Sequence, residues 1–96
     1  MIIVTTDFVS GKELITLGMA RGSTVQTKHL GKDMAAGFKT LVGGELKGYT
    51  EMMNEARAIA TKRMTEDAES QGADAVIGVR YASSAVMQGA AEIIAY

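Results

Sequence analysis

The fold is decided by residues 49–71, which read YTEMMNEARAIATKRMTEDAESQ. Apolar side chains recur there at helical spacing, with Met52, Ala56 and Met64 on one stripe and charged residues on the opposite face. A helix of this length spans about 35 Å. Gly72 follows directly and suits the left-handed residue that ends many helices. Because the stripe is rich in alanine, we expect this helix to lie close to a sheet.

The residues before this helix predict strands. Residues 2–6 are short, apolar and β-branched, which is typical of a strand. Residues 13–28 predict either one long bent strand or two strands that meet near Arg21 and Gly22. Glycine inside a strand marks a bulge or a close backbone approach, so we expect one of these at Gly18 and Gly22.

A second, shorter helix is predicted from Asp33 to Val42. Its apolar residues fall on one helical face, Asp33 can cap its first turn, and Gly43 and Gly44 can end it. Glycine residues 43, 44 and 48 would then form a corner between the two helices.

The residues after the long helix complete the sheet. Residues 75–82 predict a central strand, residues 83–91 a loop, and residues 92–96 a last strand. The order is β-β-α-α-β-β. This order predicts an α+β fold of one domain, residues 1–96: a two-layer α/β sandwich whose mainly antiparallel sheet carries two helices on one face.

Composition excludes several classes of protein. The net charge is −1, so the basic excess typical of a nucleic-acid binder is absent. The chain has no cysteine, which excludes disulfides, thiolate metal sites and a cysteine nucleophile. We find neither a signal peptide nor an apolar run of about 20 residues, so we expect no membrane contact and a cytoplasmic location. A chain of this size has a thin core, so we expect further burial in partner subunits.

Few residues are candidates for chemistry. His29 is the one histidine, and with scattered acids it forms no metal-ligand spacing, so a surface role is the stronger interpretation. Gly43 and Gly44 precede a helix N-terminus, where anions bind, although a plain helix corner that needs glycine is the stronger interpretation. Arg57 lies opposite the core stripe and could contact a ligand or a neighbouring subunit, or form an ordinary salt bridge.

The sequence resembles one family along nearly its whole length. The residues that carry this resemblance are Val4-Thr5-Thr6, Asp33, Phe38-Lys39, Val42-Gly43-Gly44, Tyr49, Ala56-Arg57, Ala60 and the run 72–79, GADAVIGV. Their order and spacing are similar to those of the YbjQ-like (UPF0145) family of small bacterial and archaeal proteins, which also carries a heavy-metal-binding label.

The resemblance implies a ring-forming subunit, typically a homopentamer, and no established activity. A divalent metal ion at the subunit interfaces is a possible cofactor, and the ligand or interface candidates are Arg57, Tyr49, Gly43, Gly44 and Asp74. Tyr49 can anchor the start of the long helix, and the Asp74 carboxylate can accept backbone amides. Two alternatives stay open: an enzyme whose site is completed between subunits, and a scaffold that docks another protein.

Overall fold

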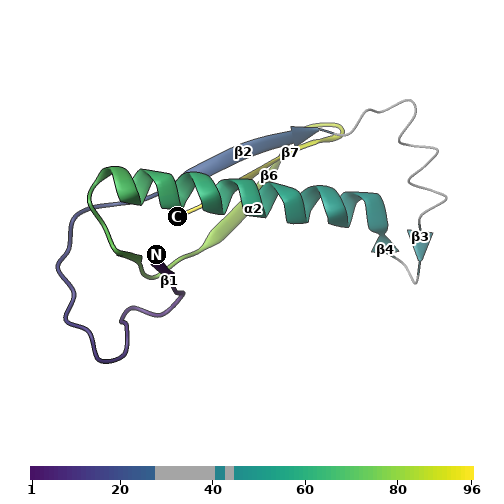
Figure 1. Ribbon diagram of the computed structural model, residues 1–96. Coiled ribbons are helices and arrows are strands. Elements are labelled where there is room, and N and C mark those ends of the chain that lie inside the picture. The colour runs from purple at the N-terminus through teal and green to yellow at the C-terminus, as the bar shows by residue number, and fades with distance from the viewer. Residues whose placement is uncertain (28–40, 43–44) are drawn as a thin grey trace.

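One helix packed on a small antiparallel sheet forms most of the protein. The computed structural model describes residues 1–27, 41–42 and 45–96. Helix α2 (Lys47–Ser70) lies lengthwise over a sheet of the order β2-β7-β6 (Figure 1). Its strands are β2 (Gly22–Thr27), β6 (Tyr81–Met87) and β7 (Ala90–Ala95), and both pairings are antiparallel. The predicted α+β class with a mainly antiparallel sheet is confirmed.

Two further pairs of short strands flank this body. Strand β1 (Ile2–Ile3) pairs in parallel with β5 (Ala75–Val76), and β3 (Leu41–Val42) pairs with β4 (Glu45–Leu46). The contact between the N-terminus and the segment after β5 continues to Thr6, whose carbonyl accepts from the Gly78 N–H at 2.8 Å. The strand expected at residues 2–6 is therefore present, with a ladder shorter than predicted and a parallel partner.

Helix α2 ends as the sequence predicts. Gly72 has a φ of 79°. Its N–H donates to the Glu69 carbonyl at 3.0 Å, and the Ala73 N–H donates to the Ala68 carbonyl at 3.1 Å. This pair of bonds is the Schellman motif, which satisfies two carbonyls left open at the end of the helix. Among the described residues, no helix combines the length and the apolar character of a membrane span.

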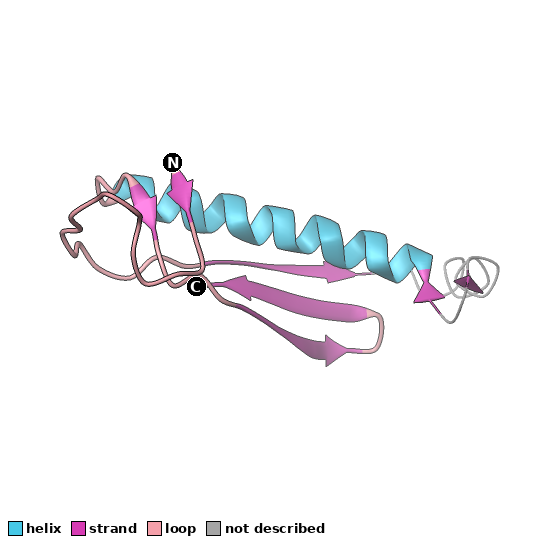
Figure 2. Cartoon of the chain, turned by 90° about the horizontal axis from the view of Figure 1, so that it is seen from below, coloured by secondary structure: helices cyan, strands magenta, loops and turns pink. Residues whose placement is uncertain are grey.

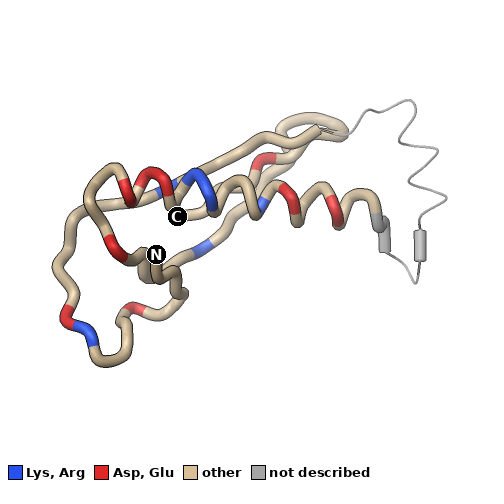
Figure 3. Tube along the Cα trace, in the orientation of Figure 1, with Lys and Arg blue, Asp and Glu red and all other residues tan. Residues whose placement is uncertain are grey.

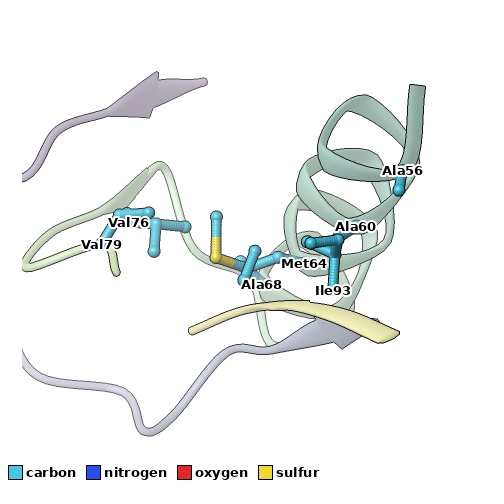
Figure 4. Packing of buried hydrophobic residues seen from close by; sticks show 8 residues of the cluster. Ala56, Ala60, Met64, Ala68, Val76, Val79 and Ile93 are labelled. Carbon is cyan, nitrogen blue, oxygen red and sulfur yellow. The ribbon is translucent and has the colours of Figure 1, made fainter. Parts of the chain in front are cut away.

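The core is thin and rests on small side chains. Met64 is its one large, fully buried side chain among the described residues, and it lies among alanines of α2, residues of the 76–79 segment and Ile93 of β7 (Figure 4). A Cβ atom added to Gly22 would lie only 2.4 Å from the Ala60 carbonyl oxygen and 2.2 Å from the Met64 nitrogen. The expected close backbone approach at Gly22 is therefore confirmed, and it joins β2 to α2.

The prediction of a shorter helix from Asp33 to Val42 is wrong at its last two residues. Leu41 and Val42 were expected in its last turn, but they form strand β3. Two residues pair there with β4, so the chain reverses immediately before α2 instead of leaving a helix. The remainder of that predicted helix, residues 33–40, and the glycines at 43 and 44 lie outside the described residues. The described residues contain one helix, and Gly48 belongs to its first turn instead of a corner.

The strand predictions also need correction. Residues 75–82 do not form one central strand, because Gly78, with a φ of 61°, separates β5 from β6. Residues 83–91 are not a loop: residues 83–87 belong to β6, which pairs with β7 across a turn at Gly89. The predicted last strand is confirmed and occupies the centre of the sheet. Of the described residues 13–27, only those of β2 form a ladder.

Candidate functional site

A hollow opens at the end of the molecule where α2 finishes. It holds about 850 Å³ and lies between residues 12–20, the end of α2 and the segment around β5. In Figure 1 the loop that follows β1 hangs below this end of the helix, and both chain termini lie near it. A volume of this size falls in the range of small-molecule sites.

The outer wall of the hollow is residues 13–19, which we call the arm. One polar contact fixes it to the helix end: the Gln71 side-chain amide donates to the Met19 carbonyl at 2.6 Å. Gly18 packs closely against the same side chain: a Cβ atom added to Gly18 would lie only 2.9 Å from Gln71 Oε1. Gly18 also has a φ of 151°, in the region that favours glycine. The arm therefore stands off the body with a single point of attachment to α2.

Two charged side chains of α2 hold the chain between the arm and β2. The Arg21 N–H donates to Asp67 Oδ2 at 3.0 Å, and Arg63 Nη1 donates to the Ser23 carbonyl at 2.8 Å. Arg63 and Asp67 are one turn apart and could pair with each other, but each binds the backbone on one side of Gly22. Charge-assisted hydrogen bonds thus hold the chain against α2 on both sides of Gly22.

The walls of the hollow are mainly apolar. Leu14, Leu17, Val76 and Ile77 contribute aliphatic surface, while the lining also includes the charged residues Lys12, Glu13 and Asp74 and the polar Gln71. Within the described ranges, no three His, Cys, Asp or Glu side chains come together in a way that could hold a metal ion. The hollow of one chain therefore combines apolar walls with a few charged and polar groups.

Tyr49 and Asp74, two of the predicted site residues, lie far apart within one chain, and Asp74 lines the hollow. Tyr49 is half-buried at the beginning of α2, whereas Asp74 is exposed beyond its end, and the 24-residue helix between them spans about 36 Å. The Asp74 contact that the structure gives is made by its carbonyl, which accepts from the Ile2 N–H at 3.2 Å. His29, Gly43 and Gly44 lie outside the described residues. Their roles stay predictions.

Arg57 lies on the exposed side of α2, as expected. Its guanidinium donates to the Asn54 side chain, and its carbonyl accepts from the Thr61 hydroxyl at 2.7 Å. Thr61 Oγ1 also lies 2.8 Å from the Tyr81 hydroxyl of β6. Charges of both signs are spread along α2, so Arg57 lies on a mixed surface instead of a basic patch (Figure 3).

One residue that lines the hollow, Gln71, was missed by sequence reasoning. It acts through a contact with a residue far along the chain, because its side-chain amide binds the Met19 carbonyl. Arg80 lies outside the lining, and its Nη1 donates to the Thr5 carbonyl at 3.1 Å. The one usable signal was the apolar alternation at Ile15, Leu17 and Met19, which predicts a strand and is found without a ladder partner among the described residues.

Comparisons with known proteins agree on one family. The family model described as "Putative heavy-metal-binding" matches residues 1–96. A "UPF0145 protein" of Clostridium novyi is 67% identical over 96 residues, which is all of this chain and 93% of the relative. A "UPF0145 protein" of Alkaliphilus metalliredigens is 68% identical with the same coverage. One of Methanosarcina acetivorans is 62% identical over 97 residues, which cover this whole chain and 92% of the relative.

Proposed function

Because the chain belongs to the UPF0145 family, whose model is described as "Putative heavy-metal-binding", we propose that it acts as a homo-oligomer that binds a metal ion or another small ligand at its subunit interfaces. The observation that carries this proposal is the set of large apolar side chains that a single chain leaves exposed among its described residues. The family resemblance sets the expected form of the oligomer, a ring such as a homopentamer.

The exposed side chains support the same proposal. Ile15 and Met19 of the arm are 85% and 82% exposed, and Phe8 close by is 60% exposed. Side chains of this kind gathered on one segment are typical of a protein–protein contact. Burying one of them fully stabilises an assembly by about 1.5–3 kcal/mol.

The ligand would bind in the hollow behind the arm, with a neighbouring subunit closing its open side. Its aliphatic walls favour an apolar or partly apolar molecule. A bound metal ion would instead need ligands from two subunits or from outside the described residues, because no group of suitable side chains forms among the described ones.

Light scattering and calorimetry test the proposal separately. A mass of several chains at micromolar concentration is expected, and a monomer would refute the assembly. Titration with Zn²⁺ or Ni²⁺ should give saturable heat if the ligand is a metal ion, and no heat above dilution would refute that part.

The hollow is tested with an apolar fluorescent dye. The dye should gain fluorescence with the wild type and lose that gain in Leu17→Asp, which places a charge in the wall. Ala58→Asp, an exposed change on α2, is the matched control. Equal dye binding by all three proteins would contradict a ligand site behind the arm.

A further inference from the structure

The outer edge of strand β6 is unpaired among the described residues and lacks the residues that usually protect such an edge. It is the outermost strand of the three, away from α2 (Figure 2), and all seven of its residues are exposed. Among the described residues, none pairs with its outer edge. Proteins usually protect such an edge with charged residues or proline. The sequence of β6, YASSAVM, has neither. Its irregularity lies at one end, between Ala85 and Met87, and leaves residues 81–85 in regular pairing.

The arm is the complementary feature, a strand-like segment without a sheet. Its apolar residues Ile15, Leu17 and Met19 alternate with other residues, as in a strand with one buried face. Within the described part of the chain, the backbone groups of residues 13–18 have no hydrogen-bond partner, and the Met19 carbonyl is bound by the Gln71 side chain. Backbone groups of this kind gain stability when a neighbouring strand pairs with them.

We propose that the arm of one subunit pairs with the free edge of β6 in a second copy of this chain. The proposal rests on the homo-oligomer of the proposed function and names the surfaces that meet. The arm has seven residues and β6 has seven, so the two segments match in length. Each chain then gives one strand and receives another, at two different surfaces.

One observation favours a second copy over another partner. The two unmatched surfaces occur on the same chain, and an exchange between copies satisfies both at once. Contacts between two different surfaces are heterologous, and when the rotation closes they form a ring in which every subunit has two neighbours.

The side chains of the two segments are also complementary in size. Strand β6 presents Ser83 and Ala85 beside Tyr81 on the side that faces α2, and Ala82 and Ser84 on the other side. The small side chains leave space beside them. The arm carries larger aliphatic side chains, so pairing would cover its exposed residues without crowding the sheet.

Cysteine cross-linking tests the proposal directly, because the wild-type chain has no cysteine. Ser84→Cys chains are mixed with Thr16→Cys chains in one sample and with Leu17→Cys chains in another, then oxidised. Successive residues of a strand point to opposite faces, so one of the two arm positions should match the face of Ser84. A disulfide-linked dimer is expected in one mixture and in neither variant alone. In the control sample, Ser84→Cys chains are mixed with Glu55→Cys chains, whose cysteine lies on the exposed side of α2, in place of an arm variant.

The outcomes separate this inference from the proposed function. A monomer by light scattering refutes both. An oligomer that gives no link between the arm and β6 refutes the pairing and leaves the assembly intact. A disulfide-linked dimer in the sample that holds Ser84→Cys chains alone would show that β6 pairs with β6 of another chain. This result would also refute the pairing of the arm with β6. As a second measurement, Ser84→Lys should reduce the mass to that of a monomer while Ala58→Lys does not, and an unchanged mass in Ser84→Lys overturns the proposal.

Discussion

The contact between Gly22 and α2 gives a sharp prediction about stability. In Gly22→Ala, the added Cβ would lie 2.2 Å from Met64 N, 2.4 Å from Ala60 O and 2.6 Å from Arg63 C. All three are backbone atoms, so no side chain can rotate to relieve the clash. The strand must move away from the helix by roughly 1 Å, and overpacking of this kind costs up to about 3 kcal/mol.

The same movement disturbs the hydrogen bonds beside Gly22. The Arg63 bond to Ser23 and the Asp67 bond to Arg21 hold β2 at its present distance, and bonds to charged groups contribute about 1.5–3 kcal/mol each. We therefore expect a total loss of about 4 kcal/mol, most of the stability of a small domain. The melting temperature should fall by about 20 °C.

The assay is thermal unfolding by circular dichroism, with Gly72→Ala as the matched control. Gly72 is constrained by its backbone conformation and not by its neighbours, because its φ is 79° and nothing lies within 4 Å of an added Cβ. Adopting this conformation costs alanine about 1–2 kcal/mol. Gly22→Ala should therefore be clearly less stable than Gly72→Ala. If the two variants melt together, or if Gly22→Ala melts near the wild type, the close approach does not hold β2 on the helix.

Three further predictions follow from the same contacts. Met64→Ala should lose about 2–5 kcal/mol in urea unfolding, because it empties the centre of a thin core and its neighbours are mostly alanines that cannot fill the space. Gln71→Leu should speed tryptic cleavage after Lys12 while lowering the free energy of unfolding by only about 1 kcal/mol, because its bond to Met19 holds the arm and not the core. Tyr81→Phe should cost less than about 1 kcal/mol in the same urea assay, because its bond to Thr61 is exposed to water.

The sequence predicts the helix and its packing well, because both depend on local chemistry. The helical stripe, the cap at Gly72 and the small alanine side chains are properties of consecutive residues, and the structure confirms each of them. The need for glycine at position 22 was also predictable as a close approach. The identity of the partner, the backbone at Ala60 and Met64, was not, because it depends on where β2 crosses the helix.

The strands were predicted less well, because a ladder depends on residues far away in sequence. Ser83 and Ser84 have small, polar side chains that are typical of a loop, yet pairing with β7 makes them part of a strand. Residues 75–79 are apolar enough for a central strand, yet the turn at Gly78 divides them. Tertiary pairing overrides weak local preference in both cases. The residues around the hollow were hidden for the same reason, since Gln71 and Met19 are separated by more than 50 positions.

The arm is a segment in which the sequence pattern and the structure of the single chain differ. Its alternation at Ile15, Leu17 and Met19 predicts a strand, and the structure places it outside every ladder among the described residues. A wrong prediction would normally be explained by a competing local signal, such as proline or a run of charge. The arm contains neither, and Gly18 already faces Gln71. The alternation therefore describes a strand without a partner among the described residues. Of the two edge strands of the sheet, β2 is held against α2 by Arg63 and by the close approach at Gly22, whereas β6 is the edge strand away from the helix. The pairing that the sequence predicts for the arm is therefore best sought at β6 of another subunit.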